Sequence, residues 1–153
     1  MQLTSPAFPD NGLIPGQFTC DGDNILPQLE ISDVPMDTQS FVLIIDDPDV
    51  PQTIRPDGNW DHLLMWNIPG DIRIIFENKL PPGTVGRNSG GHTRYDGPCP
   101  PDKEHRYFFK LYALDTVLNV PAASDKTQLL ENIQGHILTQ CKLMGRYNRI
   151  SKH

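Results

Sequence analysis

The sequence predicts a single domain built mainly from β-strands. Its 153 residues fit one domain, because domains of roughly 100–200 residues are usual. It holds 15 prolines, about double the ordinary share, and proline is disfavoured inside helices. Neither an internal repeat nor a linker-like stretch divides the chain. We therefore expect many short elements joined by turns.

Several apolar runs have the length and composition of strands. β-Branched, aromatic or alternating residues predict strands over 28–32, 40–46, 62–69 and 106–114. Residues 71–78 alternate in the same way. Residues 79–105 are predicted to be one long loop, because PPG, RNSGGH and DGPCPP do not suit regular structure. A loop of that length in a compact domain is usually functional or disordered.

From Ser124 onward the spacing becomes helical. Ser124 or Asp125 can serve as the N-cap. Apolar side chains then recur every three or four positions, at Leu129, Leu130, Ile133, Ile137, Leu138 and Cys141. We expect a helix that runs to Cys141 and buries that thiol, followed by a short tail over 142–153.

The charge excludes some classes of function. The net charge is −6 with a pI of about 5.2, and no run of lysine or arginine occurs, which argues against a nucleic-acid-binding protein. No apolar stretch approaches the roughly 20 residues that span a bilayer. The start, MQLTSPAFPDNG, has neither the basic nor the apolar region of a signal peptide. We therefore expect a cytoplasmic protein.

The three cysteines, Cys20, Cys99 and Cys141, form no CxxC pair, so a zinc ribbon is not expected. In a reducing cytoplasm all three can remain thiols. Cys20 and Cys99 both lie in turn-rich segments, where a disulfide between them is an open alternative.

Polar side chains gather at the ends of the predicted strands, in DDPDVP, NWDHLLMW, GGHTRYDGPCPP and DKEHRYFF. A metal is not expected, because no two histidines have the i,i+2 or i,i+4 spacing that places ligands on one face. Nucleophilic catalysis has two candidates, Ser89 and Cys99, but no G-x-S-x-G elbow is present.

An anion pocket accounts for these residues best. Histidines, a tyrosine hydroxyl from Tyr95 or Tyr107, and backbone N–H groups of the NSGG segment can all donate to anionic oxygens. The acids can then orient and charge the histidines. For His92 and His136, an ordinary surface role is an equally good interpretation.

Five motifs in order resemble the phosphatidylethanolamine-binding protein family, which includes the Raf kinase inhibitor proteins. CDGDNILPQL and LTQCKLMGRY resemble its bacterial and archaeal branch, and the other motifs are DPDVP, WDHLLMWNIP and GPCPPDKEHRYFFKLYAL. The resemblance implies a large antiparallel sheet, a smaller second sheet and a few peripheral helices, including one near the C-terminus. It also implies a pocket for phosphate-like anions whose ligand-binding residues are Asp47, Asp49, Trp60, His62, Gly97, Pro98, Pro100, Pro101, His105 and Tyr107.

The expected function is therefore binding of a small anion or phosphorylated ligand resembling a phospholipid head group. The protein is expected to need no cofactor and to form a homodimer, and it can regulate a signalling partner such as a kinase. The alternative is a hydrolase or lyase that uses the same histidines and acids.

Overall fold

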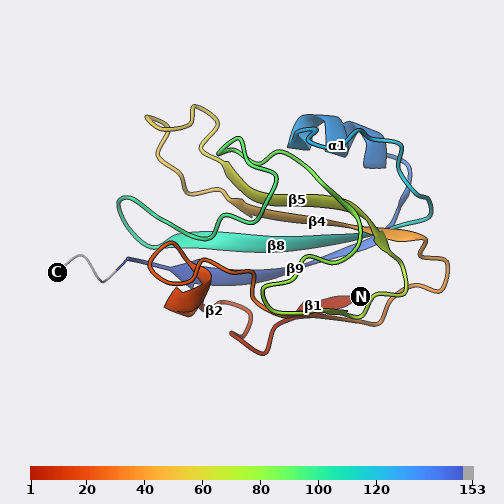
Figure 1. The fold of residues 1–153 in the computed structure, drawn as a ribbon, viewed down its shortest axis with the longest axis horizontal. Helices are drawn as coiled ribbons and strands as arrows, with labels where there is room; N and C mark the ends of the chain where they lie inside the picture. The colour runs from red at the N-terminus through yellow and green to blue at the C-terminus, as the bar shows by residue number, and fades with distance from the viewer. Residues whose placement is uncertain (150–153) are drawn as a thin grey trace.

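Two sheets pack face to face in the computed structural model, which describes residues 1–149 (Figure 1). Their strands pair antiparallel, except that β2 runs parallel to β9. The large sheet has the order β2-β9-β8-β4-β5-β7, and the small sheet has the order β1-β3-β6. The predicted mainly β fold with two sheets is confirmed. The strands are β1 Gln2–Thr4, β2 Gly12–Leu13, β3 Leu29–Ser32, β4 Ser40–Asp47, β5 Trp60–Pro69, β6 Ile74–Ile75, β7 Thr84–Val85, β8 His105–Leu114 and β9 Ile137–Tyr147.

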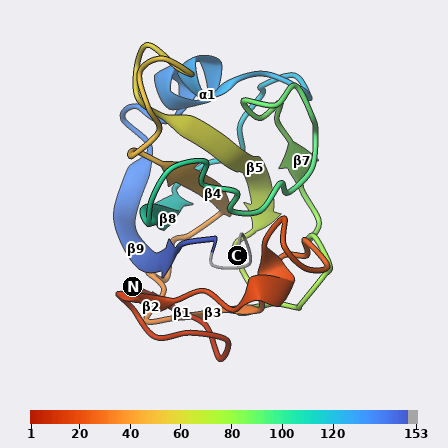
Figure 2. The ribbon, with the colours of Figure 1, turned by 90° about the vertical axis from the view of Figure 1, so that its left-hand side faces the viewer.

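The large sheet separates two apolar cores. Figure 2 shows helix α1, Lys126–Ile133, on one of its faces and the small sheet with the N-terminal segment on the other. The larger core lies between the two sheets and includes Phe41, Leu63 and Phe109. The smaller core lies under α1, where Leu129 and Ile133 cover Trp66. A short 3-10 helix, Gly16–Phe18, buries Phe18 beside the larger core.

Strands β4, β5 and β8 lie at the centre of the large sheet, where β4 and most of β5 are covered on both faces and β8 buries alternate residues. All eight residues of β4 are buried, as expected for a continuous apolar run between two cores. β4 pairs antiparallel with both β5 and β8, which places Asp47 opposite Trp60 and Asp46 opposite Phe108. The end of β4 therefore lies beside the starts of β5 and β8.

The predicted C-terminal helix is correct at its start and wrong in its length. Asp125 and Gln128 form a reciprocal capping box, and the helix ends at Ile133. Gly135 follows with a φ of 81°, which a helix does not allow. Ile137–Tyr147 is instead a strand, so Cys141 is a half-buried free thiol on β9 rather than part of a helix.

The other differences are smaller. Only Ile74 and Ile75 of the predicted strand over 71–78 pair with a neighbour, and Ile74 and Phe76 are exposed. The predicted loop over 79–105 contains the two-residue strand β7. The predicted tail is part of β9 as far as Tyr147, whereas residues 150–153 lie outside the described part of the chain.

Candidate functional site

A cavity of about 390 Å³ opens at the end of the large sheet where β4 stops and β5 and β8 start. The neighbouring loops are the β4–β5 loop, the segment before β8 and the N-terminal segment after the 3-10 helix. Eight of the ten predicted ligand-binding residues line it: Asp47, Trp60, His62, Gly97, Pro100, Pro101, His105 and Tyr107.

His105 is the most enclosed side chain of the cavity. It is 0% exposed, and its Nδ1 and Nε2 lie 2.6 Å from carboxylate oxygens of Asp47 and Asp102 respectively. A carboxylate accepts hydrogen bonds, so both ring nitrogens donate and the ring is cationic. Burial alone would lower the pKa of His105, but the hydrogen bonds with the two acids outweigh it and raise that pKa.

The two acids differ in environment. Burial raises the pKa of Asp47, against the effect of its hydrogen bond with His105. The hydrogen bond from His105 lowers the pKa of Asp102, whose side chain is partly exposed. Asp47 also accepts a hydrogen bond of 2.7 Å from the backbone N–H of Asp49. Asp47 is therefore fixed on both of its oxygens.

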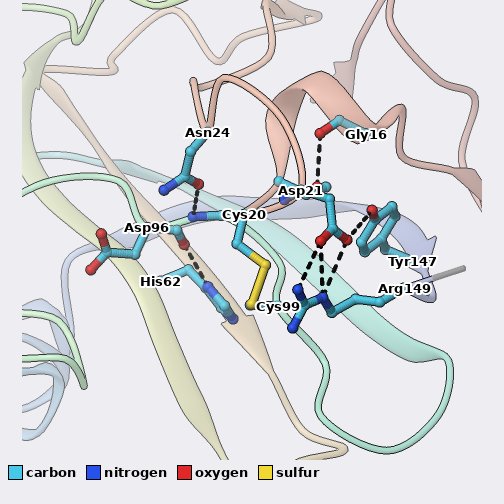
Figure 3. The surroundings of a disulfide bond; sticks show 11 residues. Gly16, Cys20, Asp21, Asn24, His62, Asp96, Cys99, Tyr147 and Arg149 are labelled. Atoms are coloured by element: carbon cyan, nitrogen blue, oxygen red, sulfur yellow. Dashed lines mark hydrogen bonds and ion pairs between the residues drawn. A yellow bond between two sulfur atoms is a disulfide. The ribbon is translucent and has the colours of Figure 1, made fainter. Parts of the chain in front are cut away.

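His62 lies next to this triad and is held from one side only. Its Nδ1 lies 2.6 Å from the backbone carbonyl oxygen of Asp96, as Figure 3 shows. Its Nε2 is buried and has no hydrogen-bond partner within residues 1–149. Burial lowers the pKa of His62, so the neutral ring is favoured.

Tyr107 provides the second unpaired polar atom. Its side chain is 1% exposed, and its hydroxyl finds no hydrogen-bond partner in the described part of the chain. The Tyr107 ring meets the edge of the His62 ring at a centroid distance of 5.3 Å. Tyr95, the other candidate donor, uses its hydroxyl to bond the carbonyl oxygen of Phe18 and is not available.

A disulfide between Cys20 and Cys99 forms part of the cavity wall (Figure 3). The bond joins the segment after the 3-10 helix to the segment before β8. Asn24 reinforces this junction by accepting a 2.8 Å hydrogen bond from the backbone N–H of Gly97. Any side chain at Gly97 would collide with the carbonyl of Phe18, so glycine is required by this close approach.

The remaining walls combine an anchored polar loop with an apolar mouth. The side-chain carboxylate of Asp96 forms hydrogen bonds with His92, Arg94 and Asn88. These contacts fix the position of the Asp96 backbone carbonyl that holds His62. At the mouth, Val50, Ile54 and Trp60 supply apolar surface, and Ile54 is 51% exposed.

Two predicted site residues do not line the cavity. The Asp49 side chain forms a bidentate pair with Arg106, at 2.8 and 2.9 Å, on the outside of β8. Pro98 accepts a backbone hydrogen bond of 3.1 Å from Cys20. Both residues therefore hold neighbouring segments of the cavity wall in place without lining the cavity themselves.

The nucleophile candidates are engaged elsewhere. Cys99 is in the disulfide, so it carries no thiol, and Ser89 accepts a hydrogen bond from the backbone N–H of Asp61. Asp61 itself pairs with Lys126 rather than with His62. The described residues hold no group of three or more His, Cys, Asp or Glu side chains placed to bind a metal.

Sequence reasoning missed Asp96, Asp102 and the wall residue Asn24. Asp102 stands three residues before His105, a spacing from which a turn can return its carboxylate to the ring. Asp96 acts through its backbone carbonyl, which residue identity does not reveal.

The sequence model of phosphatidylethanolamine-binding proteins matches residues 4–148. The chain belongs to this family. A UPF0098 protein of the archaeon Methanothermobacter thermautotrophicus is 46% identical, over 97% of this chain and 99% of its own. The solved structure of CT736, a phosphatidylethanolamine-binding protein homologue from Chlamydia trachomatis, has a TM-score of 0.94 at 43% identity, with 97% of each chain covered.

The family also includes Escherichia coli YbcL, whose structure has a TM-score of 0.86 at 29% identity and covers 96% of this chain and 97% of its own. The expected bacterial and archaeal branch of the family is thus confirmed. Within residues 1–149, no helix has the length and apolar character needed to cross a membrane.

Proposed function

We propose that the cavity binds a small anion or a phosphorylated ligand of the size of a phospholipid head group. The observation that carries this proposal is the pair of buried, unpartnered polar atoms, His62 Nε2 and Tyr107 Oη, in a cavity of about 390 Å³. Buried polar groups are nearly always hydrogen-bonded, so an unpaired pair on adjacent rings is what a missing polar ligand would leave. Membership of a family named for phosphatidylethanolamine binding supports the same ligand class.

The cavity shape agrees with a ligand that has a polar head and an apolar continuation. The paired acids and histidines lie at the base of the cavity, whereas Val50, Ile54 and Trp60 form apolar surface at its mouth. A phosphorylated head group would place its polar atoms against the buried unpaired atoms of His62 and Tyr107 and its carbon atoms against this surface.

A titration followed by NMR tests the proposal. Phosphate, phosphocholine and phosphoethanolamine are added separately while the ring signals of His62, His105 and the exposed His136 are recorded. We expect the His62 and His105 signals to shift with saturation and the His136 signal to stay fixed. Unchanged His62 and His105 signals with all three compounds would disprove the anion site.

Three finer parts remain proposals. A homodimer and a signalling partner such as a kinase come from the family alone, and a cytoplasmic location comes from the composition of the sequence. The Cys20–Cys99 bond bears on the last of these, because disulfides are rare in the cytosol of mesophiles. Cell fractionation would decide between the cytoplasm and an oxidising compartment.

A further inference from the structure

Strand β9 leaves one side of the large sheet open. Figure 2 shows β9 at the margin of that sheet, away from β7 at the other margin. β9 pairs with β8 along its whole length, Ile137–Tyr147. On its outer side β2 pairs with Gly145 and Arg146 alone. Residues 137–143 therefore form an edge with no neighbouring strand in the described part of the chain.

Hydrogen bonds at the closed end of this edge show which backbone groups of the open part point outward. The C=O of Met144 accepts from the N–H of Asn11 at 2.7 Å, and its N–H donates to a carboxylate oxygen of Asp10 at 2.9 Å. Both groups of Met144 thus point away from β8. This direction alternates along an antiparallel strand, so the N–H and C=O groups of Gln140 and Lys142 also point outward. No group within the described residues bonds them from that side.

The composition of the open edge suits it to accept another strand. Unpaired N–H and C=O groups of an edge pair with a further chain unless charges, proline or a cover prevent it. Residues 137–143, ILTQCKL, contain no proline and no acid, and Lys142 is their one charged side chain. Ile137 and Leu138 are exposed. Because the chain carries a net charge of −6, an edge without acids is where a second copy meets little repulsion.

The length of the open edge selects the register of a second β9. The N-terminal segment closes the edge at Met144. At the other end, Leu138 is an extra residue that interrupts the pairing of β8 with β9. The regular part of the open edge is therefore 139–143, and its centre is Cys141.

A twofold axis at Cys141 pairs Gln140 of each copy with Lys142 of the other copy. Each of these pairs exchanges two backbone hydrogen bonds, because outward groups then face outward groups. The side-chain amide of Gln140 also lies opposite the ammonium of Lys142 and can accept from it. An axis at Lys142 would instead place two ammonium groups opposite each other, which is unfavourable.

We propose that the protein forms a homodimer in which β9 pairs antiparallel with β9 of a second copy, so that the two large sheets become one. This inference rests on the proposed homodimer and assigns its interface. Residues 139–143 do not line the cavity at the end of β4, so dimer formation and anion binding are separate properties.

Sedimentation velocity tests the interface. The unmodified protein is expected to be dimeric at about 100 μM. Gln140→Pro removes an outward N–H and keeps the pairing with β8, because an edge strand tolerates proline on its solvent side. It should raise the dimer dissociation constant at least about thirtyfold, since two hydrogen bonds are lost in each dimer. Gln140→Ala keeps the N–H and is the matched control, with a change below about fivefold.

Charge at the same position gives a second readout that does not depend on proline. Gln140→Glu places an acid opposite Lys142 of the other copy and should tighten the dimer roughly fivefold. Gln140→Lys places like charges opposite each other and should weaken it by a similar factor.

Cys141 reports the register. On the proposed axis the two Cys141 residues form a pair without backbone hydrogen bonds, with Cα atoms about 4.5 Å apart, which is within disulfide range. Diamide should then join the two free thiols, taking up their two hydrogens to become a hydrazine while the S–S bond forms. Non-reducing electrophoresis should show a covalent dimer that Cys141→Ser abolishes.

The outcomes distinguish the interface from the functions proposed above. A monomer at every concentration would overturn both the interface and the homodimer. A dimer that withstands Gln140→Pro and responds to neither charge change would overturn the interface alone. A dimer that diamide does not cross-link would overturn the register. Phosphate binding is expected to be equal in the unmodified protein and in Gln140→Pro, and its loss in that variant would overturn the separation of interface and cavity.

Discussion

At the scale of single residues, the site depends on the contrast between two buried histidines. His105 is bonded on both nitrogens by carboxylates, whereas His62 is bonded on one nitrogen by a carbonyl. The first arrangement favours the cationic ring and the second the neutral one. His105 is thus a fixed structural cation, and His62 is the ring that can respond to a ligand.

Replacing Asp47 tests the first half of that contrast. Asp47→Asn removes one of the two charges that hold His105, so anion affinity should fall by about 1–3 kcal/mol as the base of the cavity loses its order. The loss is measured by calorimetric titration with phosphate. Asp115→Asn alters an exposed aspartate–histidine pair and serves as the control. An unchanged affinity in Asp47→Asn would make Asp47 purely structural.

The sequence predicted much of this residue-level chemistry, but not which group each side chain contacts. An acid was expected to orient a histidine of the site, and Asp47 contacts His105. Asp49 was assigned to the same wall, yet its side chain turns outward to Arg106, because a chain leaving a strand no longer alternates between two faces. The contact between His62 and the Asp96 carbonyl depends on the path of a loop, which side-chain identity does not encode.

At the scale of elements, the strands that build the site were predictable and the last strand was not. β4, β5 and β8 follow from compact apolar runs with strong β propensity. Residues 137–141 also fit a helical spacing, but ten registered pairs with β8 outweigh that local preference. Gly135 was the available signal that the helix ends earlier.

The capping box of α1 gives a test at this scale. Asp125→Ala removes the side chain that accepts from the backbone N–H of Gln128, so the free energy of unfolding should fall by about 1 kcal/mol. Urea denaturation measures the change. Glu131→Ala, on the exposed side of the same helix, should change it by less than about 0.5 kcal/mol. Equal effects would show that the cap contributes nothing specific.

At the scale of the whole molecule, one covalent bond connects parts of the chain that no strand pairing joins. Cys20 and Cys99 are 79 residues apart in sequence and meet at the cavity wall. The sequence left this pairing open because it contains no measure of the distance between two loops. The disulfide therefore stabilises both the fold and the shape of the site.

Removal of the bond should be costly. A closed loop of this length predicts a loss of about 4.5 kcal/mol in the free energy of unfolding on reduction. Denaturation with and without a reducing agent measures it, and the Cys20→Ala/Cys99→Ala variant should match the reduced protein. Cys141→Ser removes the free thiol of β9 and should leave the response to reductant unchanged. Equal stability of the oxidised and reduced forms would contradict this role.

The most direct test of the central claim is a crystal structure of the protein with inorganic phosphate. The claim is that His62 Nε2 and Tyr107 Oη form hydrogen bonds with a polar ligand in the cavity. We predict a tetrahedral anion in the cavity, within hydrogen-bond distance of both atoms. An empty cavity, with phosphate bound instead at surface cations such as Arg106 and Lys142, would contradict the account.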